Sequence, residues 1–355
     1  MSAPVVGRPQ TASQRTERRT RAIGMLCGIV VILLFSSFTL VSRFGFASSL
    51  KLADIAALRF TIAGVLMLPV LLHYGLSGTR WRDAAALAFT GGLGFALFAY
   101  AGFSLAPASH GAVLLHGTIP LFTFVMGWAA TSPAVGIRRA VGLYAIFLGI
   151  LTMAIESVAY SSQRQLLGDG ALLLASVSWS AYGLLVRRIG LAPAHSASIV
   201  AVLSMCCFLP VYLVLPGKAI LSAPWHDLVL QGVFQGVLIG AIGIFVYSRA
   251  VATLGAGETA LFTAAVPCVT TIAGMFLLGE APSGIAWAGV AIVTVGMVIS
   301  LNGAKPPSGA HDYEKQPDEF STEYAHAVRR GGPGDDAYRL LAEIEEKRSW
   351  WGRSR

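Results

Sequence analysis

The stretch from His110 to Thr131, HGAVLLHGTIPLFTFVMGWAAT, decides the fold class of this chain. It contains no Asp, Glu, Lys or Arg, and it reaches the roughly 20 residues that an α-helix needs to cross ~30 Å of hydrocarbon. It lacks the alternation of period two that a membrane-spanning strand would show. Only a helix satisfies its own backbone polar groups in lipid over such a length, so the stretch predicts a transmembrane helix.

Nine further runs of similar length flank it with little polar sequence between them. Hydrophobic residues make up 55% of the chain and charged residues only 12%, whereas a soluble domain carries about 25% charged residues. The sequence therefore predicts an all-α integral membrane protein with ten transmembrane helices. The ten runs are 22–42, 55–74, 84–103, 110–131, 137–155, 169–187, 196–216, 228–250, 258–279 and 284–302.

The placement of arginine and lysine predicts the orientation in the membrane. If segment 1–21 is cytoplasmic, the inside segments hold twelve arginines and the outside segments hold only Arg43, Lys51, Arg164 and Lys218. We therefore expect a basic cytoplasmic N-terminal segment, a cytoplasmic C-terminus and a location in the plasma or inner membrane. The alternative is a signal peptide cleaved after the small-x-small sequence 45–47. The twelve inside arginines are Arg8, Arg15, Arg18, Arg19, Arg21, Arg80, Arg82, Arg138, Arg139, Arg187, Arg188 and Arg249.

An internal repeat divides the chain into residues 22–155 and 168–302. A shift of 147 positions gives nine identities between 98 and 153 without a gap. In both copies a proline is followed by a glycine seven residues later, and then by two glycines seven apart. The matched pairs are Phe98 and Phe245, Tyr100 and Tyr247, Leu114 and Leu261, Pro120 and Pro267, Thr123 and Thr270, Gly127 and Gly274, Ala134 and Ala281, Gly142 and Gly289, and Gly149 and Gly296.

Five spans per copy is an odd number, so the second copy must lie upside down in the membrane. Two inverted five-helix repeats with a site near the midplane are a common plan of secondary transporters, because the two copies allow one packing open to each side. The alternative is a duplication that serves folding alone.

Several stretches resemble the EamA-type drug/metabolite transporters, over about residues 22–302. They are LADIAALRF at 52–60, SWSAY at 178–182, AGETA at 256–260 and LLGE at 277–280. The resemblance implies a ten-span carrier of a small organic solute with two EamA repeats, and it alone suggests efflux. This chain departs from the family pattern at Pro133, which stands where the first copy should carry a counterpart of the acidic Glu280.

Arg59 is the most informative single residue. A charged side chain inside a span costs several kcal/mol unless it faces the bundle interior or finds a partner. Arg59 either anchors a substrate carboxylate or an interhelical pair, or it snorkels to the outer surface. Asp54 lies five residues earlier and is reachable as a partner only if the helix starts late.

Glu258 begins the ninth run and also has two interpretations. It is either a proton-coupling carboxylate or an acidic residue that stabilises a helix N-terminus. Its repeat counterpart is Gly111, so either role belongs to one copy only.

Prolines predict bent helices at equivalent places in the two copies. Pro120 leaves the carbonyl of His116 without its helical donor, and Pro267 does the same for Thr263. Irregular backbone at membrane depth is tolerated mainly where it is buried in protein or lines a cavity. The bends therefore point to a substrate path, with packing alone as the alternative.

Aromatic residues and glycines complete the candidate path. Aromatic walls suit a small organic solute, whereas an interfacial belt or simple helix packing is the alternative. Gly232, Gly236 and Gly240 form a small-xxx-small ridge that predicts close helix contact, with Gln231 and Gln235 bonding to a neighbouring helix. The candidate aromatic residues are Phe35, Phe38, Tyr100, Trp179, Tyr182 and Tyr247.

We therefore interpret the chain as a secondary transporter of a small organic metabolite, amino-acid-like or drug-like, working by alternating access. No nucleotide-binding loop, nucleophile elbow or metal-ligand spacing is present, so we expect no cofactor, no metal, no nucleic acid and no enzymatic activity. A membrane-embedded lipid or isoprenoid enzyme and a non-transporting scaffold are the alternatives. Proton or ion coupling and a homodimer are left open. The segment 303–355 predicts a disordered cytoplasmic tail with one short helix near 335–350.

Overall fold

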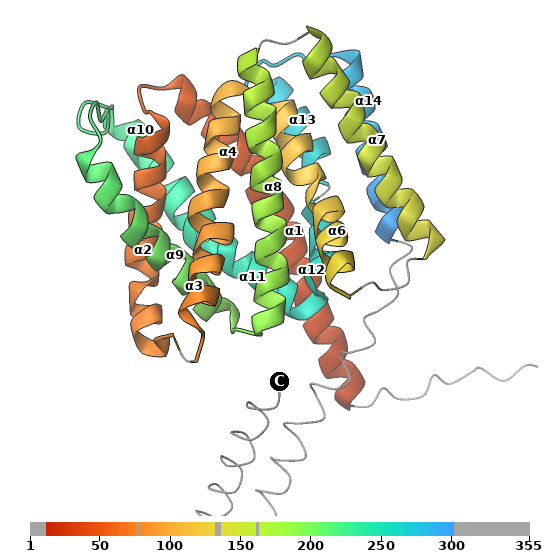
Figure 1. Ribbon diagram of the computed structural model, residues 1–355, viewed down its shortest axis with the longest axis horizontal. Coiled ribbons are helices and arrows are strands. Elements are labelled where there is room, and N and C mark those ends of the chain that lie inside the picture. The colour runs from red at the N-terminus through yellow and green to blue at the C-terminus, as the bar shows by residue number, and fades with distance from the viewer. Residues whose placement is uncertain (1–11, 77, 132–135, 161–162, 264, 302–355) are drawn as a thin grey trace, which may run out of the picture. The chain divides into compact units, whose positions relative to one another are not determined.

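The computed structural model describes residues 12–76, 78–131, 136–160, 163–263 and 265–301, and every secondary-structure element in these ranges is a helix (Figure 1). The tail, with its expected short helix, and the first eleven residues lie outside them. The first repeat comprises α1 (Ala12–Ala47), α2 (Leu52–Tyr74), α3 (Trp81–Ala88), η1 (Phe89–Leu93), α4 (Gly94–Leu105), α5 (Ala108–His110), η2 (Gly111–Gly117), α6 (Ile119–Thr131) and α7 (Ile137–Tyr160).

The second repeat continues with the same order of spans. It comprises α8 (Gln163–Ile189), α9 (Pro193–Val214), α10 (Trp225–Gln231), η3 (Gly232–Gly243), α11 (Ile244–Leu254), α12 (Ala256–Thr263), α13 (Val266–Leu277) and α14 (Gly284–Leu301).

Apolar helices make this a multi-pass membrane protein. In the described part of the chain, 8 helical segments are long and apolar enough to cross a bilayer, and Gly284–Ser300 is a shorter apolar helix. The all-helical membrane fold is thus confirmed, and the count of ten spans stays a prediction. Helices α1 and α8 begin well before the apolar runs at 22 and 169, because polar helix formers such as Gln, Arg and Glu continue each helix beyond the apolar segment.

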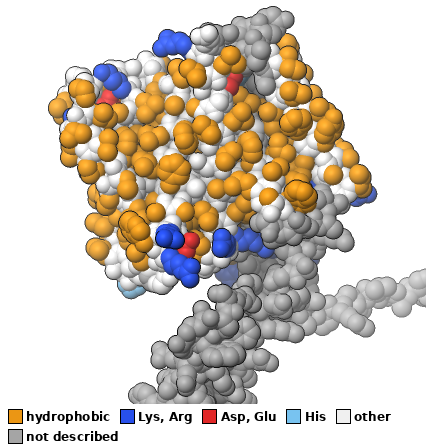
Figure 2. Space-filling model, viewed as in Figure 1, with side chains coloured by type: hydrophobic (Ala, Val, Ile, Leu, Met, Phe, Trp, Pro, Cys, Tyr) orange, Lys and Arg blue, Asp and Glu red, His pale blue; other side chains and the backbone are white. Residues whose placement is uncertain are grey.

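The surface agrees with a lipid environment. Figure 2 shows hydrophobic side chains over most of the visible face, with Lys, Arg and acidic residues near its margins. Charged residues and ion pairs mark the two ends of the helical bundle. We call one the Glu280 end, which includes Arg43 and Asp54. We call the other the Glu258 end, which includes Arg21.

Counterpart helices of the two repeats lie antiparallel against each other. A Cβ atom placed on Gly142 of α7 would lie 2.5 Å from the backbone oxygen of Gly296 in α14, while one on Gly149 would lie 2.9 Å from that of Gly289. Figure 1 shows these two helices side by side. The contacts run in opposite directions along the two helices, as glycine-mediated packing in lipid allows.

The predicted helix breaks are present in both repeats. Pro120 is the second residue of α6 and Pro267 is the second residue of α13, positions where a proline costs no hydrogen bond. A second irregularity was not predicted: η1 and η3 are π-helical, and the 147-residue shift places 89–93 inside the range of η3. The predicted glycine ridge lies within η3, where Gly236 faces Ile62 of α2.

Candidate functional site

Arg59 is buried inside the bundle, with 1% of its surface exposed. The snorkelling interpretation is therefore wrong, since the guanidinium does not reach the surface. The pairing with Asp54 is also wrong, because that carboxylate is engaged elsewhere. It accepts hydrogen bonds from the Tyr212 hydroxyl at 2.6 Å and from the backbone nitrogens of Lys51 at 2.9 Å and Ala219 at 3.3 Å.

The surroundings of Arg59 leave its charge incompletely compensated. The guanidinium lies over the rings of Phe38 and Phe95, at 5.3 and 5.9 Å from their centroids. The neutral Tyr100 hydroxyl interacts with the guanidinium, but no hydrogen bond of good geometry joins either terminal nitrogen to another described residue. Each cation–π contact contributes about 0.5–2 kcal/mol. The burial of a charge costs several kcal/mol, so these contacts do not fully offset the burial of Arg59, and its terminal N–H groups still lack a charged acceptor.

A small cavity adjoins Arg59, and two pairs of counterpart elements contribute residues to its lining. Helices α2 and α9 form one pair, and the π-helical segments η1 and η3 form the other. Such segments occur often at functional sites, because they displace the backbone locally. The cavity is lined by Arg59, Phe60 and Ala63 of α2, Val200, Ala201 and Ser204 of α9, Gly92 of η1, Gly240 of η3 and Ile244 of α11.

The aromatic candidates form one buried cluster beside this cavity. Phe95 lies 4.5 Å from Trp179, and Trp179 lies 4.7 Å from Tyr247, as ring centroid distances. Phe38 contacts Tyr100 at 5.8 Å on the Arg59 side of the cluster. Phe38, Tyr100, Trp179 and Tyr247 are each at most 1% exposed, so the interpretation as an interfacial belt is wrong for them.

His116 belongs to the edge of the same cluster. Its ring lies 5.2 Å from that of Phe35, and neither ring nitrogen has a hydrogen-bond partner among the described residues. Its backbone oxygen, which Pro120 leaves without a helical donor, accepts a hydrogen bond from the Thr263 hydroxyl at 3.5 Å. The two broken helices therefore meet at their counterpart positions.

Glu258 lies away from the Arg59 cavity. It occupies the first turn of α12, and its carboxylate is 4.0 Å from the guanidinium of Arg21. About a fifth of the side chain is exposed, 21%. The position suits the stabilisation of a helix N-terminus, and the coupling role stays a prediction.

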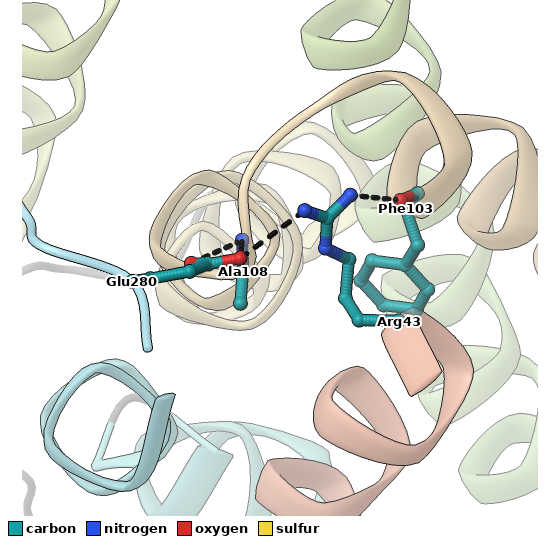
Figure 3. Close-up of polar contacts among 4 residues, drawn as sticks. All are labelled: Arg43, Phe103, Ala108 and Glu280. Carbon is teal, nitrogen blue, oxygen red and sulfur yellow. Dashed lines mark hydrogen bonds and ion pairs between the residues drawn. The ribbon is translucent and has the colours of Figure 1, made fainter. Parts of the chain in front are cut away.

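A network that the sequence did not predict closes the Glu280 end (Figure 3). Arg43 of α1 lies 3.2 Å from the Glu280 carboxylate, and it also donates to the Phe103 carbonyl at 3.1 Å. Glu280 accepts a further bond from the backbone nitrogen of Ala108 at 3.0 Å. The network ties α1, α4 and α5 to the segment after α13.

Three further polar contacts were missed as well. Buried His110 lies 3.0 Å from the Asp169 carboxylate, and His195 of α9 contacts the Gly75 carbonyl at 2.9 Å. Gln235 accepts from the Tyr100 hydroxyl at 3.0 Å. The sequence did offer one indication of these contacts, because ionisable residues inside apolar runs mark buried or functional positions. The expected bonding of Gln231 and Gln235 to a neighbouring helix is confirmed, since both donate to α1.

Comparisons with known proteins agree with this architecture. The sequence profile of the EamA-like transporter family matches residues 22–155 and 166–302. No curated protein matches the chain. A solved structure titled only "Crystal structure of protein" has a TM-score of 0.56 and 18% identity, and the alignment covers 78% of this chain and 96% of that chain. At this identity the likeness concerns the fold alone.

Proposed function

This chain belongs to the EamA-like transporter family, and we propose that it is a secondary transporter of a small organic metabolite that works by alternating access. One observation carries the proposal. The small cavity at Arg59 lies where α2 meets its counterpart α9, and the counterpart segments η1 and η3 each contribute a glycine to its lining. A site at the interface of two repeats is accessible from either side when one repeat rocks against the other.

The antiparallel packing of counterpart helices supports an inverted arrangement of the repeats. Polar contacts link helices at both ends of the cavity in this conformation. Asp54 and Tyr212 join α2 to α9 at the Glu280 end, while His195 and the Gly75 carbonyl join them at the other. Release of one link at a time is the movement that alternating access requires.

The proposed orientation places both termini in the cytoplasm and the Glu280 end outside, with export as the direction. The excess of arginine in the segments assigned to the inside supports it. A reporter fused after Gly217 in the full-length protein should report an outside location. Fluorescence or enzyme activity that is typical of the cytoplasm at this position would contradict the orientation.

Transport itself is tested with the full-length protein in proteoliposomes. We expect saturable counterflow of at least one radiolabelled compound from a panel of organic acids, amines and neutral metabolites. Protein-free liposomes are the control, and each assay runs with and without a pH gradient to reveal proton coupling. Fluxes equal to those of protein-free liposomes for the whole panel would contradict the proposal.

A further inference from the structure

We infer that the buried guanidinium of Arg59, beside this small cavity, binds the anionic group of the transported solute and that the substrate class is an organic monoanion with an apolar or aromatic body. This inference rests on the proposed function and makes it more specific. It starts from a buried cation whose two terminal nitrogens are unpartnered among the described residues.

No acidic side chain in the described ranges is an ion-pair partner of Arg59. The acidic residues in their ion pairs are Glu258, Glu280, Asp169 and Asp227, and each is paired with another residue. Asp54, on the same helix, is saturated by Tyr212 and by backbone nitrogens. The counter-charge of the guanidinium therefore has to come from outside the described chain.

The Tyr100 hydroxyl interacts with the guanidinium, but it is a neutral group and does not balance the charge of Arg59. The Tyr100 hydroxyl donates to Gln235, and the Gln235 amide donates to the Ser42 hydroxyl at 3.0 Å. Ser204, in the cavity wall, donates to the Ala88 carbonyl at 3.3 Å. The planar fork of an arginine matches a carboxylate with two parallel hydrogen bonds, so a carboxylate is the group that fits the terminal nitrogens best.

The aromatic rings packed around Arg59, outside the cavity lining, define the body of the solute. Phe38 and Phe95 lie beneath the guanidinium, and Phe95 continues into the cluster around Trp179. These faces suit an aromatic or aliphatic group next to the anion. One buried positive charge balances one negative charge and repels a cationic group, and the lining contains no carboxylate that could receive an ammonium.

The test uses a matched set of probes on the full-length protein in nanodiscs. N-Acetylphenylalanine is the anion, its amide is the neutral analogue, and phenylalaninamide is the cation. We expect the anion to bind at least ten-fold more tightly than the neutral amide, with no measurable binding of the cation, in equilibrium binding with radiolabelled probes. Acetate, benzoate and N-acetyltryptophan, each beside its amide, extend the set to other sizes.

Three variants connect the preference to Arg59. Arg59→Gln should reduce the ratio of anion to amide affinity to about one, and Arg59→Lys should keep part of it. Arg188→Gln removes an exposed arginine and should leave the ratio unchanged. Thermal unfolding is recorded for each variant to show that it folds, and the comparison of probes on the unaltered protein stands without the variants.

The outcomes separate this inference from the proposed function. If no carboxylate binds more tightly than its amide, or if Arg59→Gln folds and keeps the preference, the inference is wrong. Counterflow of neutral or cationic compounds that carboxylates do not inhibit would also overturn it and leave the transporter intact. Absence of counterflow for every compound would instead refute the proposed function, whatever the binding data show.

Discussion

Two ionisable residues on α2 have opposite surroundings although only five positions separate them. Asp54 lies in the first turn of the helix, where free backbone nitrogens and the helix dipole favour a negative charge. It is buried, yet it accepts hydrogen bonds from three donors, one hydroxyl and two backbone nitrogens. Arg59 lies about one and a half turns further on, where neighbouring helices present aromatic rings and the neutral Tyr100 hydroxyl instead of a carboxylate. Position on the helix therefore separates a structural charge from a candidate binding charge.

Removal of the Asp54 carboxylate should destabilise the protein. Asp54→Ala leaves the Tyr212 hydroxyl and two backbone nitrogens without their acceptor, which should lower the free energy of unfolding by roughly 2–4 kcal/mol. Tyr212→Phe removes one hydrogen bond and should lower it by about 1.5 kcal/mol. Thermal unfolding in detergent measures both effects. Tyr144→Phe is the matched control, because Tyr144 is 62% exposed. An Asp54→Ala protein as stable as the control would contradict this account.

At the scale of elements, glycines determine how closely helices approach. A Cβ atom on Gly236 would lie 2.6 Å from the Ile62 Cβ, so η3 packs on α2 without room for a side chain. Lipid offers no hydrophobic drive for helix association, and close backbone contact supplies the attraction instead. The same principle applies to α7 and α14, where glycines of both helices meet.

Gly236→Ala should weaken the contact between η3 and α2. Overpacking of this kind costs about 1–3 kcal/mol, against the gain of up to about 1 kcal/mol in helix propensity. Gly170→Ala, which would meet nothing within 4 Å, is the control and should be neutral or stabilising. Ile62→Ala should partly rescue Gly236→Ala in a double-mutant cycle. Additive effects of the two substitutions would show that the residues do not interact.

At the scale of the whole molecule, the proposed alternating access predicts that the networks at the two ends control which side of the cavity opens. The Arg43–Glu280 pair is only partly exposed, with 30% and 20% of the two side chains accessible. Such a pair is worth about 1 kcal/mol. That free energy corresponds to a roughly five-fold change in the ratio of closed to open conformations.

Glu280→Gln should therefore open the Glu280 end more often. A cysteine introduced at Ser109, which is 6% exposed, should react about five-fold faster with a membrane-impermeant maleimide in the Glu280→Gln background. The measurement uses a variant from which the four native cysteines have been removed. Cysteine at the exposed Ser104 is the control and should react at an unchanged rate. Equal rates at Ser109 would show that the pair does not restrain this end.

Much of the architecture was predictable because the signals for it are local in the chain. Runs of apolar residues predict helices in lipid, and Pro120 and Pro267 predict breaks at counterpart positions, since a proline affects the turn that contains it. The aromatic residues were grouped correctly because two of them occupy repeat positions. The contacts of Asp54 with Tyr212 and of Arg43 with Glu280 were not predictable, because these partners lie far apart in the sequence.

By itself, the sequence determined that this protein is helical, crosses the membrane repeatedly and consists of two related halves, because run length, proline position and repeat spacing are properties of the chain alone. Only the tertiary structure decided which face of each helix turns inward. In lipid an apolar helix carries no polar stripe that sets its rotation, so the cavity beside Arg59, the aromatic cluster and the paired π-helical segments emerge only when the helices pack.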